Sequence, residues 1–358
     1  MGPFENNVGR TRSRSGLALT LVSATDVRDA TEVATAFAGV RPPAPDRHVE
    51  TDGDDSGDFG LHLAETVFAS ADAGVTGETV VVLEPSADVM EVALVCEYVL
   101  TRREAHEVPV LLREVIAVSS VREILDRFLE IGDAPSDVVD DAPERLAARL
   151  EFASTIVLAD LEDAPGDARA ALALALVERL NPTATVTAVD GVVWLRSLPI
   201  ARTETRAHRI GAHMGWQLEL SSDGPNSSGL VEAAVFRDPR PFHPTRLATA
   251  IATELTPSRI GRILRSKGLV RLASRPERVG SWSSAGDLLS LDPTGMTSWD
   301  PDSPAGQEIV FFGHRLESEL LTDVLSRCLL TPEELLEGAG VWRSYSDPFP
   351  AWGDTHHH

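Results

Sequence analysis

The chain contains one lysine, Lys267, and the residues around it limit which phosphate chemistry the sequence can support. A loop that binds nucleotide phosphates needs glycines, so that backbone N–H groups can close around the phosphates. It also needs a lysine to neutralise them and a serine or threonine to hold Mg²⁺. Lys267 lies instead in RILRSKGLV, which is typical of a strand. The sequence therefore excludes nucleotide hydrolysis by a glycine-rich phosphate loop.

Histidine is the residue type here that most readily binds a transition metal, but its spacing predicts no defined site. His243 opens a predicted helix in the sequence RPFHP, where a helix cap is the more typical role. The sequence leaves open whether the three terminal histidines are a native tail or a trimmed purification tag. We therefore expect no cofactor, with zinc as the metal to consider. The weak candidates for metal ligands are His243, His356, His357 and His358.

No other spacing of residues indicates a catalytic centre. We find no serine–histidine–aspartate set, no His-Glu-x-x-His helix and no pair of carboxylates at a defined spacing. The two cysteines, Cys96 and Cys328, are far apart in the chain, so a zinc knuckle or Cys-x-x-Cys pair cannot form. We expect both thiols to be buried.

Basic residues are concentrated between positions 259 and 278, where seven arginines and lysines stand against a single acid, Glu277. If the side chains alternate along a strand, several would share one exposed face that could meet phosphate or an acidic partner. The alternative is internal pairing with acids of the other domain. The candidate partner-binding residues are Arg262, Arg265, Lys267, Arg271, Arg275 and Arg278.

Composition limits the class of protein. A chain of 358 residues, 43% of them hydrophobic, is long enough for two domains. The net charge of −23 argues against a general nucleic-acid binder, because phosphate contacts need a surplus of lysine and arginine. No apolar run approaches the roughly 20 residues that cross a bilayer, and no signal peptide is evident. We expect a cytoplasmic protein without a membrane partner.

Alternating strands and helices predict a parallel α/β domain over residues 16–200, after a disordered lead at 1–15. The acidic stretch 41–60 is expected to be a loop. The predicted strands are 17–23, 79–85, 113–120, 154–161 and 183–191. The predicted helices cover 26–37, 88–102, 121–131, 143–152 and 166–180. Near-continuous apolar strands separated by helices favour a parallel sheet covered on both faces.

A second, smaller α+β domain is predicted over residues 230–340, after a linker at 201–229 and before a surface tail at 341–358. The segment DPTGMTSWDPDSP (292–304) is expected to be an exposed loop. The predicted strands are 230–236, 262–274, 278–286 and 307–313. The predicted helices are 243–255, 315–328 and 331–338.

Three segments of this second domain resemble the C-terminal domain of the CobW family of metal-handling GTPases. They are DPRPFHPTRL (238–247), RILRSKGLVRLASRPERVGSWSSAG (262–286) and QEIVFFGHRLESELLTDVLSRCLLTPEEL (307–335). The closing W-x-S-Y-x-D-P-F-P-x-W (342–352) is similar to the tail of actinobacterial members, including paralogues linked to zinc starvation and ribosome remodelling. The resemblance implies a P-loop-GTPase-like first domain and a CobW C-terminal domain.

The first domain departs from the family at each position that carries its chemistry. LVSATDVRDATE (21–32) has no glycine where the phosphate loop should be, and ADLED (159–163) lacks the lysine of the guanine-reading Asn-Lys-x-Asp. The family's Cys-x-Cys-Cys is also missing, since no cysteine precedes Cys96. The sequence thus predicts a degenerate GTPase-like domain.

These departures lead to two hypotheses about function. The first is a non-catalytic CobW-like binding or regulatory protein, related to zinc limitation or to the ribosome, that meets a protein or ribonucleoprotein partner through its basic strand. The alternative is a chaperone for Zn²⁺ or Co²⁺ that has lost GTP hydrolysis. Neither hypothesis identifies the partner or the oligomeric state.

Overall fold

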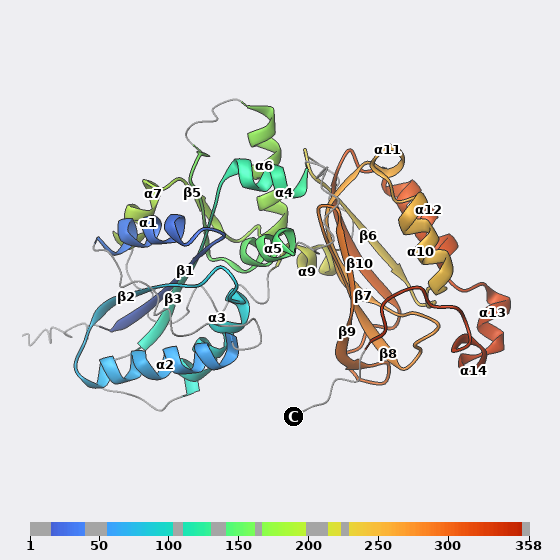
Figure 1. Ribbon diagram of the computed structural model, residues 1–358, viewed down its shortest axis with the longest axis horizontal. Helices are drawn as coiled ribbons and strands as arrows, with labels where there is room; N and C mark the ends of the chain where they lie inside the picture. The colour runs from blue at the N-terminus through green and yellow to red at the C-terminus, as the bar shows by residue number, and fades with distance from the viewer. Residues whose placement is uncertain are drawn as a thin grey trace, which may run out of the picture.

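The chain folds around two five-stranded sheets, as seen in the computed structural model (Figure 1). The structure describes residues 16–39, 56–102, 110–129, 141–161, 167–197, 214–222 and 229–352. The N-terminal sheet is parallel and the C-terminal sheet is antiparallel. The predicted class is therefore confirmed: a parallel α/β domain is followed by a smaller α+β domain. The predicted lead at 1–15 lies outside the described residues.

The parallel sheet has the strand order β2-β1-β3-β4-β5. Its strands are β1 (Leu17–Ala24), β2 (Gly77–Val82), β3 (Val110–Ser119), β4 (Thr155–Leu158) and β5 (Thr185–Thr187). Its helices are α1 (Val27–Ala38), α2 (Ser56–Asp72), α3 (Val89–Arg102), α4 (Val121–Phe128), α5 (Ala142–Phe152), α6 (Ala168–Leu180) and α7 (Gly191–Ser197). All five predicted strands are present, with shifted ends.

Helices cover both faces of this sheet, which explains why its central strands are apolar along their length. All eight residues of β1 are buried. Val22 and Ala24 pack with α1 and α7 on one face, while Leu19 and Leu21 pack with α2 and α3 on the other. The prediction of an acidic loop at 41–60 is wrong at its end, because α2 begins at Ser56. Residues 41–55 lie outside the described part.

The antiparallel sheet has the order β6-β10-β7-β8-β9. Its strands are β6 (Glu232–Asp238), β7 (Arg262–Val270), β8 (Arg278–Ala285), β9 (Leu288–Thr297) and β10 (Gln307–His314). Helices α10 (Pro244–Thr253) and α12 (Ser318–Cys328) pack on one face, and α11 (Pro257–Ile260), α13 (Pro332–Glu337) and α14 (Ala339–Trp342) complete the domain. The predicted loop at 292–304 is wrong over 292–297, which belong to β9.

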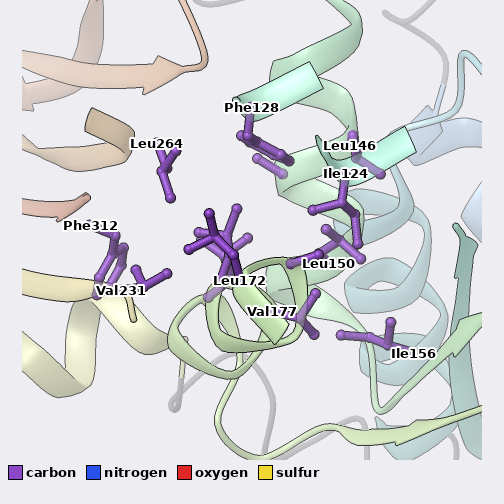
Figure 2. Close-up of a cluster of buried hydrophobic side chains, with 14 of the residues drawn as sticks. Ile124, Phe128, Leu146, Leu150, Ile156, Leu172, Val177, Val231, Leu264 and Phe312 are labelled. Atoms are coloured by element: carbon purple, nitrogen blue, oxygen red, sulfur yellow. The ribbon is translucent and has the colours of Figure 1, made fainter. Parts of the chain in front are cut away.

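The other face of the antiparallel sheet packs directly against the N-terminal domain. Figure 2 shows Phe128 and Leu150 of the first domain in one cluster with Leu264 and Phe312 of the second. Each of these four side chains is at most 1% exposed. A helix, α9 (Gly215–Ser221), lies within the predicted linker 201–229 and contributes to this cluster. The two domains therefore share one hydrophobic core.

Within the described residues, none of the helices is both long and apolar enough to span a bilayer. The longest, α2, has 17 residues and carries acidic side chains.

Candidate functional site

The carboxyl edge of the parallel sheet is the first place to look for a ligand. In doubly wound sheets ligands bind where the strand order reverses, outside the carboxyl ends of the strands. Here the reversal falls between β1 and β3, because β2 lies on one side of β1 and β3 on the other. The segments that follow these two strands are Thr25–Asp26 and Ser120, which lead into α1 and α4.

The N-terminus of α1 is capped by the chain's own carboxylate. Asp26 is the N-cap residue and accepts a hydrogen bond from the backbone N–H of Arg28 at 2.8 Å. A second acid, Asp29, lies in the first turn. Burial raises the pKa of the Asp29 carboxyl, and the charges of Asp26 and Glu123 raise it further. A bound phosphate would meet negative charge here.

The N-terminus of α4 is closed in the same way. Asp160 accepts hydrogen bonds from the backbone N–H groups of Val121 at 2.6 Å and Arg122 at 3.1 Å. The Ser120 hydroxyl accepts a third, from the N–H of Glu123 at 2.9 Å. Asp160 belongs to ADLED (159–163), the segment in which the family's guanine-reading motif was expected. Its carboxylate thus binds the backbone donors that would otherwise receive an anion.

A buried arginine, Arg149, also lies near this edge, and both of its terminal nitrogens form hydrogen bonds with the protein. Its guanidinium donates to Thr25 Oγ1 at 2.9 Å and to the carbonyl oxygen of Pro85. Arg149 is 4% exposed, and burial lowers the pKa of its guanidinium. No sequence motif indicated this residue. The edge therefore combines acidic helix caps with a buried arginine that is hydrogen-bonded to the protein, which disfavours binding of a nucleoside triphosphate.

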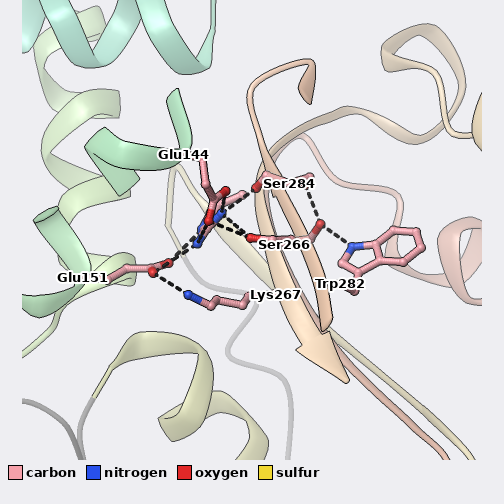
Figure 3. Close-up of polar contacts among 8 residues, drawn as sticks. Glu144, Glu151, Ser266, Lys267, Trp282 and Ser284 are labelled. Carbon is pink, nitrogen blue, oxygen red and sulfur yellow. Dashed lines mark hydrogen bonds and ion pairs between the residues drawn. The ribbon is translucent and has the colours of Figure 1, made fainter. Parts of the chain in front are cut away.

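A second polar centre joins the two domains (Figure 3). Arg265 of β7 is fully buried and ion-paired with Glu144 at 2.5 Å and with Glu151 at 2.7 Å, both on α5. Lys267 donates to Glu151 at 3.3 Å. Burial would lower the pKa of Arg265, but Glu151 and Glu144 raise it above its usual value. Burial would likewise raise the pKa of Glu151, but Arg265 and Lys267 lower it.

The predicted basic face is therefore not a single exposed surface. The prediction is wrong for Arg265, which points into the domain interface; for Arg265 and Lys267 the alternative of internal pairing is confirmed. Arg262 pairs with Asp287 at 2.6 Å, at the turn between β8 and β9.

The other three candidates contact the loop that precedes β10 and the segment that follows α14. Arg271 donates to the carbonyl oxygen of Pro304 at 2.6 Å. Arg275 pairs with Asp347 at 2.8 Å, and Arg278 donates to the carbonyl oxygen of Trp352 at 3.3 Å. Arg265 is buried, and the other five residues are only partly exposed to solvent.

His243 is the N-cap residue of α10, as the sequence predicted, although its side chain forms no capping hydrogen bond. Its ring stacks on Tyr345, with centroids 4.7 Å apart, and its Nδ1 is buried without a partner among the described residues. Burial and then the charge of Arg246 lower its pKa. His356, His357 and His358 lie outside the described residues. In the described part of the chain, no group of three His, Cys, Asp or Glu could hold a metal.

Both cysteines are buried, as expected. Burial raises the pKa of Cys96 to about 12 and that of Cys328 to about 11, so neither thiol is prepared to act as a thiolate.

A cavity of about 160 Å³ opens in the C-terminal domain between α10 and the β7–β9 end of the sheet. Leu255 and Leu289 form apolar parts of its wall, and Trp282, Ser266 and Ser284 contribute polar groups. The Trp282 indole N–H donates to Ser266 Oγ at 2.8 Å. Nothing in the sequence indicated this cavity, because its walls come from segments that are far apart in the chain.

Comparison with known proteins agrees with the architecture of the second domain. Residues 231–329 match the model of the cobalamin synthesis protein cobW C-terminal domain. The match covers the second domain, which is therefore similar to the C-terminal domain of the CobW family.

Two curated relatives have names connected with zinc. The zinc-regulated GTPase metalloprotein activator 1 of Dictyostelium discoideum is 29% identical over 228 residues, covering 57% of this chain and 47% of that protein. A zinc chaperone of Mycobacterium tuberculosis is 28% identical over 232 residues, covering 57% of this chain and 53% of that protein. The chain spans about half the length of the curated relatives it matches.

Among solved structures, the Zn(II)-bound YjiA GTPase of E. coli is 15% identical to this chain. The alignment covers 88% of this chain and 99% of that one, with a TM-score of 0.32.

Proposed function

We propose that this chain is a non-catalytic CobW-family binding or regulatory protein that acts in zinc-limitation physiology through its C-terminal domain. The observation that carries the proposal is the use of Asp26 and Asp160 as helix caps where a phosphate-binding GTPase needs free backbone N–H groups. The acidic edge adds electrostatic repulsion of phosphate. The zinc-related names of the two relatives support the physiological setting.

Phosphate release from Mg²⁺·GTP tests the non-catalytic part. We expect the rate with purified chain to equal that of a matched variant in which Asp160 is replaced by Asn, and both to equal buffer alone. A turnover that rises with chain concentration and is lost in Asp160→Asn would contradict the proposal, because it would assign Asp160 a catalytic role.

The second candidate function is a metal chaperone that has lost GTP hydrolysis, and the name of the mycobacterial relative favours it. Calorimetry with Zn²⁺ separates the two. The matched protein is the variant His356→Ala/His357→Ala/His358→Ala, which removes the terminal histidines. One-site, sub-micromolar binding that survives in this variant and is lost in His243→Ala would support the chaperone, whereas binding that disappears with the terminal histidines would reject it.

The proposed partner is a protein or a ribonucleoprotein such as the ribosome. Its contact would fall near Arg271, Arg275 and Arg278, which are partly exposed and lie away from the domain interface that holds Arg265 and Lys267. Co-sedimentation with purified ribosomes tests this, comparing the unsubstituted chain with Arg271→Glu/Arg275→Glu. Equal amounts in the ribosomal pellet for both proteins would reject a ribosomal contact at this position.

A further inference from the structure

The segment that closes the described chain, residues 346–352 (SDPFPAW), lies across the C-terminal domain and contains no helix or strand. It follows α14 and contacts β8, β9 and the loop that joins β7 to β8. Thr245 donates to the carbonyl oxygen of Ser346 at 2.9 Å, which fixes the first residue of the segment. We name the surface beneath it the tail groove, formed by Thr245, Ser274, Arg275, Arg278, Gly280 and Leu291.

The acidic residue of the segment is held by complementary groups. Asp347 accepts hydrogen bonds from the Arg275 guanidinium at 2.8 Å and from the Ser274 hydroxyl at 2.5 Å. Arg275 also donates to the carbonyl oxygen of Phe349 at 3.1 Å. The Asp347 carboxylate accepts the N–H of Phe349 at 3.0 Å, so the turn is stabilised from within the segment. The Arg275 guanidinium therefore donates both to the Asp347 carboxylate and to the backbone carbonyl oxygen of Phe349.

The aromatic residues of the segment pack closely on the domain. Phe349 and Trp352 pack against the core that contains Trp282. The Trp352 indole donates to the carbonyl oxygen of Leu291 at 2.9 Å. A Cβ built on Gly280 would lie 2.6 Å from the Trp352 ring, so only glycine at this position admits the indole. Arg275 lies over the same ring at 4.3 Å.

Two features distinguish the segment from a structural element of the domain. Pro348 and Pro350 lack backbone N–H groups, so the segment cannot form the hydrogen-bond ladder of a sixth strand. The hydrogen bonds that join it to the domain all use a side chain of the domain or of the segment. Proline-fixed segments that dock on aromatic-lined grooves are a recurring mode of peptide recognition, since little ordering entropy is lost.

The tail groove also contains a hydrogen-bond donor that the segment does not use. Arg275 Nη1 is buried and has no hydrogen-bond partner within the described residues. A buried donor without an acceptor is costly, so a ligand that supplies one more acceptor would bind better than the chain's own segment.

We propose that the tail groove is a peptide-binding site for proline-fixed acidic–aromatic segments of the type Asp-Pro-Phe-Pro-x-Trp, and that residues 346–352 are its intramolecular ligand. The chain's own segment keeps the groove filled until a partner segment of the same chemistry replaces it. The C-terminal domain would then bind peptides of this type whether or not the chain binds zinc or ribosomes.

A labelled peptide with the sequence of residues 344–352 tests the proposal by fluorescence anisotropy. The full-length variant Asp347→Asn/Trp352→Ala weakens the resident segment in place. A tethered segment acts at roughly millimolar effective concentration, so we expect the peptide to bind this variant at least about tenfold more tightly than the unsubstituted chain. Adding Gly280→Ala to the variant should abolish binding, because the new Cβ would meet the indole of the peptide.

The matched control is Arg327→Gln in the same background, since Arg327 is an exposed arginine of α12 that is paired with Glu254. It should leave the affinity unchanged. A peptide carrying the same Asn and Ala replacements should not bind any of these proteins.

A measurement on the unsubstituted chain does not depend on the folding of any variant. Millimolar peptide should increase hydrogen exchange at the non-proline amides of 346–352 and leave exchange in β1 unchanged. The proposal would be overturned by absence of peptide binding to the folded double variant, by binding that Gly280→Ala leaves unchanged, or by tail exchange that does not respond to peptide.

Discussion

The two domains differ in what occupies the places where each could bind a ligand. At the carboxyl edge of the parallel sheet, Asp26 and Asp160 bind the N–H groups of α1 and α4 and are integral to the folding of those helices. On the C-terminal domain, the tail groove is filled by a terminal segment without regular structure. A cap cannot leave without exposing helix ends, whereas a segment can be exchanged. Binding function is therefore expected in the second domain.

Ion pairs and apolar packing hold the two domains together. The buried pairs of Arg265 with Glu144 and Glu151 lie beside the shared apolar core. Because Arg265 and Glu151 are buried, the charge of each depends on the presence of the other, while Glu144 is 30% exposed.

The largest expected effect is that of Arg265→Met. It leaves Glu151 buried without its strongest partner, and removing one member of a buried pair costs about 3–5 kcal/mol. Urea denaturation followed by circular dichroism measures the loss. The triple variant Arg265→Met/Glu144→Gln/Glu151→Gln should recover most of it, because no fully buried charge is left without a partner and Lys267 is 25% exposed to solvent.

The matched control for this prediction is Arg327→Met, which breaks an exposed pair with Glu254. It should cost less than about 1 kcal/mol. If Arg265→Met is no worse than Arg327→Met, the interface pairs do not hold the domains together.

Asp160→Ala should have an intermediate effect, because it exposes the N–H groups of Val121 and Arg122 that the carboxylate now binds. Loss of such a cap costs about 1–2 kcal/mol. Asp167→Ala is the matched control, since Asp167 caps α6 through a single exposed hydrogen bond. Thermal unfolding should place the Asp160 variant below the Asp167 variant. A stabilised Asp160→Ala protein would show that the edge tolerates free donors and is therefore open to anions.

The smallest effect concerns Glu334, which accepts two hydrogen bonds from Arg246 at the base of the tail. The Arg246 hydrogen bonds lower the pKa of Glu334 to about 2. A depressed carboxyl pKa stabilises the fold above the unfolded value of about 4.3. That stability is lost as the pH falls toward 2. Melting temperatures between pH 2 and 5 should therefore fall less steeply for Glu334→Gln than for the unsubstituted chain; parallel curves would contradict the assignment.

The sequence predicted the order of most elements because their apolar periodicity is strong. It missed α2 and β9 for identifiable reasons. The stretch 41–60 was expected to be a loop, but Gly60 lies within α2, where a Cβ would lie 3.0 Å from the carbonyl oxygen of Val92, so the glycine allows α2 to pack closely on α3. The stretch 292–304 was also expected to be a loop, but its Pro293 lies in β9, the edge strand of its sheet, where proline is tolerated.

The candidate site was less predictable than the fold. Missing glycines and lysine were visible in the sequence, so the loss of a phosphate loop could be stated from it. The residues that bind the backbone donors at this edge could not be predicted, because Asp160 accepts a hydrogen bond from α4, 39 positions away in the chain. The burial of Arg265 likewise depends on Glu144, which is 121 positions away. The first contact arises when the N-terminal domain folds, and the second only when the two domains pack together.

The most direct test of the closed sheet edge is a titration of the full-length chain with a fluorescent GTP analogue in the presence and absence of Mg²⁺. Because the backbone donors are capped and no loop lysine exists, we predict no saturable binding in the micromolar range under either condition. Micromolar affinity that requires Mg²⁺ and is competed by unlabelled GTP would contradict the central claim.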